Sequence, residues 1–171
     1  MIKKDLIMGI DPGLKNTGWC LIENQTHREI YIAHGVISTK TNNILGERLS
    51  FIYDRLDNLM KQFNPNFVAV EKIFSNVNPQ SSLNLGKARG IAFLVAAKNN
   101  IPLSEYSPNT VKKNLVGYGH ANKFQIIQMI NRLFPKAQVI EEDAADALAV
   151  AICHSMQAKS KIKDVMEKYD S

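Results

Sequence analysis

The stretch LIMGIDPG at residues 6–13 joins a continuous apolar run to an acid and a Pro-Gly turn. A short apolar run that ends at turn residues is typical of a buried strand. We therefore expect a core strand over residues 6–11 with Asp11 at its carboxyl end. An unpaired carboxylate in such a place costs free energy, so Asp11 needs a partner or a ligand. Taken alone, Asp11 could equally be a turn former before Pro12.

Two further segments repeat this combination of apolar residues and an acid. Glu71 ends the apolar run at 67–70, while Asp143 and Asp146 open a helix of small and aliphatic residues that continues to Cys153. Singly, Glu71 could pair with a neighbouring base, and Asp143 could cap the helix. Together, four buried acids would repel one another unless they shared a divalent cation. A site made of carboxylates favours Mg²⁺ or Mn²⁺ over zinc.

The hydrophobic pattern outside these segments alternates between strand and helix periods. Residues 18–23 and 30–38 are expected to be strands that continue from the first one as an antiparallel meander. Apolar residues then recur at three- and four-residue steps over 45–63, which predicts a helix stopped by Pro65. The remaining expected elements are strands at 67–71 and 102–106 and helices at 82–98, 110–115, 122–134 and 143–158.

These elements predict an α/β domain with a mixed sheet of about five strands, a meander followed by parallel strands, flanked by helices. Residues 1–158 would form this single domain, and residues 159–171 a polar C-terminal tail. Sheets of this kind bind ligands beyond the carboxyl ends of their strands. If the strands that end in Asp11 and Glu71 are parallel neighbours, both carboxylates project at one edge.

The helical pair of acids fits the same site. Asp143 and Asp146 are three residues apart, so they share a helix face with β-carbons about 5–6 Å apart. The small residues Ala144, Ala145 and Ala147 would let this helix approach the sheet closely. Four carboxylates can hold two cations about 3.5–4 Å apart, the arrangement of two-metal phosphoryl transfer.

Composition adds weaker constraints. The chain has 171 residues, 21 basic against 16 acidic side chains, and a formal net charge of +5. A basic surface attracts polyanions such as nucleic acid or anionic membrane, but charge alone does not separate these partners from a simple solvated surface. Cys20 and Cys153 lie in apolar surroundings without metal-ligand spacing, which indicates reduced core residues. The first apolar stretch is too short for a signal core, so we expect a cytoplasmic protein.

Five motifs resemble, in order, those of the RuvC-type Holliday-junction resolvases, and the likeness runs from about residue 7 to residue 154. The resemblance implies a ribonuclease H-like fold, a homodimer, and nicking of two strands of a four-way DNA junction with Mg²⁺, or Mn²⁺ as a substitute. It also implies a junction-migrating helicase complex of the RuvA and RuvB type as partner. The motifs are GIDPG at 9–13, VEKIF at 70–74, LGKARG at 85–90, VGYGHANK at 116–123 and DAADALA at 143–149.

The resemblance also assigns roles to single residues. The family's four catalytic, metal-binding acids correspond to Asp11, Glu71, Asp143 and Asp146, with two metal ions per active site. Its DNA-contacting positions correspond to Lys112, Lys123 and the aromatic Phe74, which would otherwise be a core residue. Lys113 is expected to be a neighbour only. Arg89 could reach a phosphate or form a helix-surface ion pair. The small residues of the helix at 82–98 would pack against its own sheet or across a dimer axis.

Three other functions compete with this interpretation. The nearest is the related ribonuclease branch that processes ribosomal RNA precursors on the same fold. A junction-binding module without catalysis would have a broken carboxylate set, whereas this chain has all four acids. An actin-like ATPase also begins with a strand ending in Asp near glycine, but it needs a second phosphate-binding hairpin and a longer chain.

Overall fold

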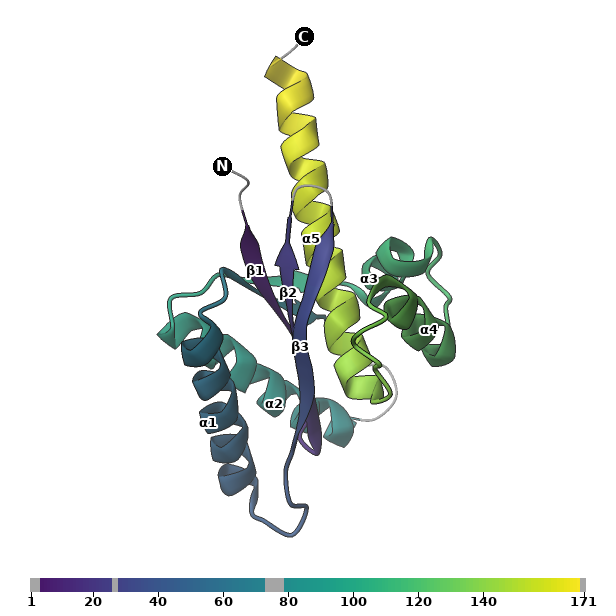
Figure 1. The fold of residues 1–171 in the computed structure, drawn as a ribbon. Coiled ribbons are helices and arrows are strands. Elements are labelled where there is room, and N and C mark those ends of the chain that lie inside the picture. The colour runs from purple at the N-terminus through teal and green to yellow at the C-terminus, as the bar shows by residue number, and fades with distance from the viewer. Residues whose placement is uncertain (1–3, 26–27, 73–78, 170–171) are drawn as a thin grey trace.

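The computed structural model describes residues 4–25, 28–72 and 79–169, and these form one sheet covered on both faces by helices (Figure 1). The strands are β1 (Asp5–Asp11), β2 (Asn16–Asn24), β3 (Glu29–Ser38), β4 (Phe67–Glu71) and β5 (Leu103–Tyr106). The helices are α1 (Leu45–Phe63), α2 (Pro79–Lys98), α3 (Pro108–Val116), α4 (Lys123–Leu133) and α5 (Glu142–Tyr169). All ten predicted elements are confirmed, with shifts of a few residues at most ends.

The sheet has the predicted mixed topology, with the strand order β3-β2-β1-β4-β5. β1, β2 and β3 form the antiparallel meander, while β4 and β5 run parallel to β1. β1 and β4 are neighbours, in register from Ile7 opposite Phe67 to Ile10 opposite Val70. Consequently the next residues, Asp11 and Glu71, leave the sheet side by side.

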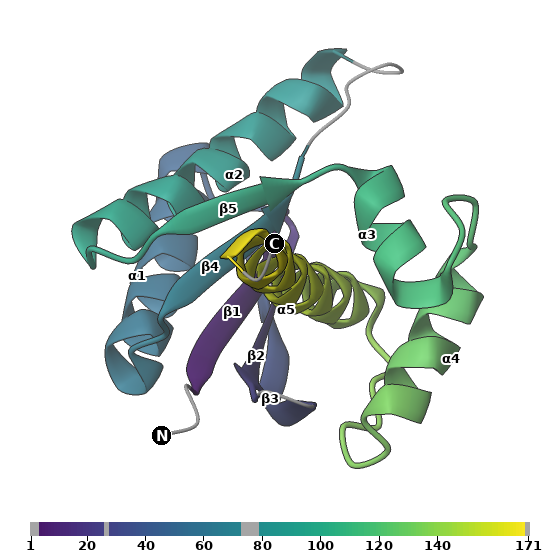
Figure 2. The ribbon, with the colours of Figure 1, turned by 90° about the horizontal axis from the view of Figure 1, so that it is seen from above.

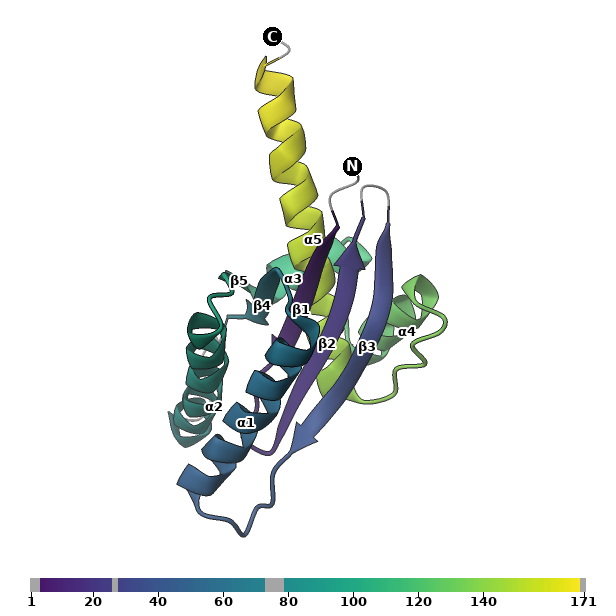
Figure 3. The same cartoon turned by 60° about the vertical axis from the view of Figure 1, so that its left-hand side comes forward.

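The two faces of the sheet carry separate cores, and Figures 2 and 3 show the helices that cover each face. Successive residues of a strand point to opposite faces, so Met8 and Ile10 pack toward α1 and α2, whereas Ile7 packs toward α5. Figure 2 shows α1 and α2 on one side of the sheet and α5 on the other, with α3 and α4 beyond α5. Since Asp11 and Glu71 follow the alternation, both belong to the α5 face.

Local signals explain where the helices begin and end. Ser107 caps α3 by accepting a hydrogen bond from the Thr110 amide, and Gly117 ends α3 in the left-handed region with φ of 87°. In α4, Asn122 and Gln125 form a capping box in which each side chain accepts from the other residue's amide. The capping box thus occupies the Asn122 and Gln125 amides at the start of α4.

Helix α5 is longer than the sequence pattern predicted. It continues to Tyr169, so the expected end near residue 158 is too early. No glycine or proline follows Ala158 to stop it, and polarity alone does not end a helix. In Figure 1 its C-terminal part projects beyond the sheet. Ser155 and Lys159 still contact the domain, because both donate hydrogen bonds to the Glu29 carboxylate of β3. A separate tail over residues 159–171 stays a prediction.

The two cysteines are free and buried, as predicted. Burial raises the pKa of Cys20 to about 12 and that of Cys153 to about 11, which keeps both thiols protonated and unreactive. Among the described helices, none has both the length and the apolar character needed to cross a bilayer.

Candidate active site

The carboxyl ends of β1 and β4 bring the first two predicted acids together. Asp11 and Glu71 are the final residues of these parallel strands, one step beyond the last paired positions. The turn after Asp11 is held by Thr17, whose hydroxyl donates to the Gly13 carbonyl oxygen at 2.8 Å. Beyond Glu71, the Lys72 amide continues the ladder by donating to the Tyr106 carbonyl oxygen at 2.7 Å. Both carboxylates therefore stand on well-anchored backbone.

Two glycines bring α5 against this end of the sheet. Gly18 lies opposite Asp11 in the β1–β2 ladder, and a Cβ on Gly18 would lie only 1.9 Å from the Asp143 carbonyl oxygen. Likewise, a Cβ on Gly9 would lie 2.1 Å from the Ala147 carbonyl oxygen. Because glycine has no side chain, the backbone of α5 rests directly on the strands. The first turn of α5 is thus placed beside Asp11.

Electrostatic effects show that the four acids share one environment. Burial, followed in order by the charges of Asp146, Asp143 and Glu71, raises the pKa of Asp11 from 3.8 to about 8. Burial and the Asp146 charge likewise raise the pKa of Glu71 to about 7. The pKa of Asp146 is also raised, chiefly by burial. Asp11 and Asp143, which lie far apart in the chain, are therefore neighbours in space.

The donor set suits an oxygen-bound divalent cation. Within residues 4–25, 28–72 and 79–169, no three His, Cys, Asp or Glu side chains stand as a preformed metal-binding group. The acids can still affect one another's pKa values, because the interaction between two charges extends over longer distances than a bond from a carboxylate to a metal ion. Several partly buried carboxylates facing each other are costly unless protonated or neutralised. Hard cations such as Mg²⁺ and Mn²⁺ take such oxygen ligands.

Two predicted DNA-binding lysines face the same acids. Lys112 in α3 lowers the pKa values of Glu71 and Asp146. Lys123, the first residue of α4, lowers those of Asp146 and Asp11. The carboxylates are thus bordered by cations from two other elements. This is the charge arrangement expected where a phosphate group has to approach a metal site.

Lys123 also has a partner that the sequence pattern did not reveal. Its Nζ atom lies 2.5 Å from a carboxylate oxygen of Glu142, the first residue of α5. This contact is the main reason that the pKa of Lys123 is raised. Residues 19 positions apart give no periodic signal, so the sequence alone does not pair them.

Arg89 forms an ion pair within the protein, which was one of its two expected roles, the other being a contact to a DNA phosphate. Its guanidinium binds the Glu105 carboxylate and the Glu71 carbonyl oxygen. Lys113 is exposed on α3, and its carbonyl oxygen accepts the amide hydrogen of Gly117. Phe74 lies outside the described residues. The glycines at positions 9 and 18 were missed as site residues, because nothing local marks a position that a distant helix covers.

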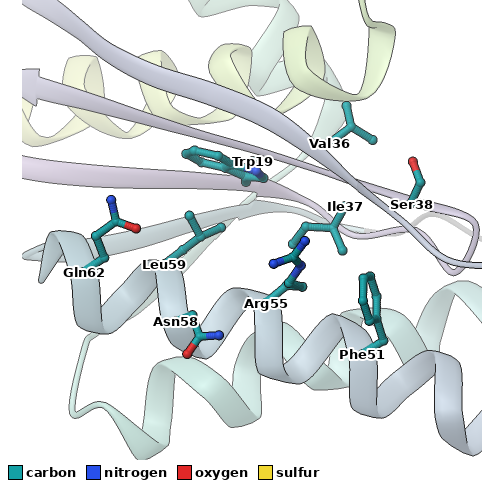
Figure 4. A pocket seen from close by; sticks show the side chains of 9 residues that line it. All are labelled: Trp19, Val36, Ile37, Ser38, Phe51, Arg55, Asn58, Leu59 and Gln62. Atoms are coloured by element: carbon teal, nitrogen blue, oxygen red, sulfur yellow. The ribbon is translucent and has the colours of Figure 1, made fainter.

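A hollow of about 350 Å³ lies away from the acids, between α1 and the edge formed by β2 and β3 (Figure 4). Trp19, Phe51, Arg55 and Gln62 are among its lining residues, and none of the lining residues is acidic. It opens on the α1 face, whereas the acids lie on the α5 face. A second hollow, of about 520 Å³, lies along α3 and α4 and is lined by Tyr118, Gln128 and Arg132, among others. The acid cluster is separate from both.

Comparison with known proteins identifies one family. Residues 7–154 match the family model described as crossover junction endodeoxyribonuclease RuvC. Proteins of that name from Bartonella tribocorum and Paramagnetospirillum magneticum are 46% and 45% identical over 153 and 149 residues. These alignments cover 90% and 87% of this chain and 90% of each relative.

Solved structures agree with the sequence relatives. The fold is similar to RuvC of Thermus thermophilus in complex with a Holliday junction substrate, with a TM-score of 0.85, 28% identity, and coverage of 92% of this chain and 96% of that chain. It is also similar to the yeast mitochondrial Holliday junction resolvase, with a TM-score of 0.69, 18% identity, and coverage of 96% and 86%. The second likeness concerns the fold alone.

Proposed function

The chain belongs to the crossover junction endodeoxyribonuclease RuvC family, and we propose that its active site consists of Asp11, Glu71, Asp143 and Asp146. Its ribonuclease H-like fold and its enzyme class follow from this membership. It is a divalent-metal nuclease that resolves four-way DNA junctions. We propose that it does so by paired nicks. The observation that carries the site assignment is the parallel register of β1 and β4, which end side by side in Asp11 and Glu71, with Asp143 packed against Gly18 opposite Asp11.

The cofactor in this proposal is Mg²⁺, two ions per active site, with Mn²⁺ as a substitute. When bound, the ions would supply an activated water and would stabilise the leaving oxygen of an in-line displacement. The four carboxylates would hold them, at the half-buried ends of β1 and β4 and at the start of α5. Asp11 has a pKa of about 8, so cation binding would displace a proton from its carboxyl group at neutral pH.

The DNA would be held beside the acids by lysines. Lys112 and Lys123 border the carboxylates from α3 and α4. Their cationic side chains would bind backbone phosphates, which positions a strand without reading its sequence. We propose the same DNA-binding role for Phe74, through base stacking at the crossover, which is worth about 1–3 kcal/mol per base.

We also propose that the enzyme is a homodimer joined along α2. Leu83 and Leu94 are 60% and 48% exposed on this helix. They lie at helical spacing with Gly86 and Gly90, where an added Cβ would meet nothing within 4 Å. Exposed leucines beside glycines form a face that a second helix can approach closely. A dimer with a two-fold axis matches a four-way junction, because it places one site on each of two equivalent strands.

The cellular setting is proposed from the family alone. A resolvase acts on junctions that a helicase complex of the RuvA and RuvB type migrates, so we propose this complex as partner. Chromosomal junctions in bacteria lie in the cytoplasm, which is the proposed location.

Incubation with a synthetic mobile four-way junction, with and without a chelator, tests the function. The expected result is a pair of symmetric nicks on two of the four arms, which Mg²⁺ restores after chelation. A structured RNA serves as the competing substrate. Cleavage of the RNA but not of the junction would contradict the proposal, as would nicking by the Asp143→Asn protein.

A further inference from the structure

Arg89 in α2 joins three elements at the end of the strand that carries Glu71. Its Nη1 atom donates a hydrogen bond to the Glu71 main-chain carbonyl oxygen, and its Nη2 atom forms an ion pair with the Glu105 carboxylate in β5. The Arg89 side chain is only 13% exposed, so water screens these contacts weakly. A guanidinium presents its donors in a fixed planar arrangement, which suits it to bridge two acceptors.

This anchor holds the backbone of Glu71 and leaves its carboxylate free. The carboxylate interacts with Asp146 of α5 and Lys112 of α3, on the face of the sheet opposite α2. Arg89 therefore fixes the main chain of Glu71 from one face of the sheet, while the Glu71 carboxylate lies on the other face. Position matters here, because a misplacement of about 1 Å can cost about 100-fold in rate.

The same guanidinium reaches the exposed face of α2. The Arg89 Cζ atom lies 5.2 Å from the centre of the Phe93 ring, within cation–π range. Phe93 is 37% exposed and neighbours Leu94 on the face proposed above for a second copy of the chain. Arg89 thus stands between that face and the end of β4.

We propose that Arg89 is a positioning residue that couples the dimer face of α2 to the placement of Glu71. A second copy covering Phe93 would remove water from beside the guanidinium. Hydrogen bonds and ion pairs strengthen in such a drier environment, so the Glu71 backbone would be held more firmly. The metal site would then be complete mainly in the dimer, and a lone subunit would nick poorly. This inference rests on the proposed function, since it takes the second copy and the metal-binding role of Glu71 from it.

Binding of Mn²⁺ to the full chain in the absence of DNA tests the coupling without relying on activity. Free Mn²⁺ is measured by electron paramagnetic resonance for the wild type, Arg89→Ala, Arg89→Lys and the dimer-breaking Leu94→Glu. The matched control is Arg55→Ala, because Arg55 lies 5.4 Å from the Phe51 ring centre on α1 in the same kind of stack, away from the acids. Sedimentation gives the oligomeric state of every variant.

We expect Arg89→Ala to weaken Mn²⁺ binding by about tenfold, with Arg89→Lys intermediate and Arg55→Ala within about twofold of the wild type. Leu94→Glu should weaken Mn²⁺ binding by a similar factor. The double variant of Arg89→Ala and Leu94→Glu should bind Mn²⁺ as well as either single variant does, since both changes interrupt the same coupling between the dimer face and Glu71. Junction binding in the absence of metal should stay within about twofold for Arg89→Ala.

The possible failures are distinct. Unchanged Mn²⁺ binding in Arg89→Ala, or additive effects in the double variant, overturns the coupling while leaving the nuclease intact. A monomeric wild type with tight Mn²⁺ binding overturns it as well. A wild type that neither binds Mn²⁺ nor nicks the junction instead overturns the proposed function. If Arg89→Ala does not fold, Arg89→Lys is judged by the same criteria, because it keeps the charge and loses the bridge.

Discussion

The two faces of the sheet bury different kinds of side chain. Toward α1 and α2, strand residues such as Met8, Ile10 and Val70 fill the core with large aliphatic groups. Toward α5, glycines meet the helix backbone directly, and carboxylates of raised pKa follow at the strand ends. Both faces gain stability from buried apolar area, since Ile7, Leu148 and Ile152 are buried on the α5 face as well. The α5 face differs because its glycines give up side-chain packing for close approach and because it keeps acids that oppose folding. The candidate site therefore lies on one side of the sheet, whereas both sides contribute stability.

The largest expected effect comes from filling the close contact on the α5 face. Gly18→Ala would place a Cβ against the Asp143 carbonyl oxygen, where only a shift of α5 could relieve the clash. We expect a loss of about 1–3 kcal/mol in unfolding free energy, measured by urea denaturation, together with loss of cleavage. Gly46→Ala in α1 is the control, because a Cβ there meets nothing within 4 Å. Equal effects of the two changes would contradict the contrast between faces.

Removing one acid should separate catalysis from binding. Asp143→Asn is expected to reduce cleavage by about 1,000-fold or more, equivalent to about 4 kcal/mol of activation free energy. Junction binding should persist, because the lysines remain. Without metal the protein should be slightly more stable, since Asp143 is one of the charges that raise the pKa of Asp11. Gel-shift and nicking assays on one junction measure both, and a joint loss of binding and cleavage would refute these roles.

The pH dependence of stability should reveal the raised pKa of Asp11. The pKa of Asp11 is about 8 in the folded protein against an ordinary 3.8, so the native state binds this proton more tightly than the unfolded state does. Its contribution to stability is therefore present below about pH 4 and is lost as pH rises through about 8. In chelator, the wild type should lose stability relative to Asp11→Asn over this range. Asp54→Asn on α1 is the control for removing a carboxylate away from the acids, and Mg²⁺ should reduce the difference between the wild type and Asp11→Asn.

A smaller effect is expected for the lysine that borders the acids. Lys123→Ala should weaken junction binding by about tenfold. It should also reduce the slope of the logarithm of the binding constant against the logarithm of salt concentration by about 1, as expected when one phosphate contact is lost. Binding measured at several salt concentrations gives both quantities. Lys113→Ala is the matched control, and a comparable change there would show that the effect is general surface charge.

The smallest effect concerns the ion pair of that lysine. Glu142 competes with a DNA phosphate for Lys123, so Glu142→Gln should tighten junction binding by about twofold to fivefold, as expected for an exposed pair. Asp57→Asn breaks a pair of the same 2.5 Å length with Lys61 on α1 and should leave binding unchanged. Weaker binding in Glu142→Gln would mean that Glu142 instead orients Lys123 toward the phosphate.

The sequence by itself determined the elements of the fold and singled out the four candidate acids. Apolar periodicity, prolines and glycines act over a few residues, so the strand 67–71 and the helix 45–63 were predicted with the ends that the structure has. Acids at the edges of apolar runs are visible in the same local way. The end of α5 was missed because a polar segment without a stop signal can remain helical.

Only the tertiary structure decided how these parts meet. It placed Gly18 beneath Asp143, joined Lys123 to Glu142, and joined Arg89 to the backbone of Glu71. These contacts link positions that are far apart in the chain and follow from how α5 and α2 pack on the sheet. Packing depends on the shapes of all the surrounding side chains at once, so no local pattern in the sequence encodes it.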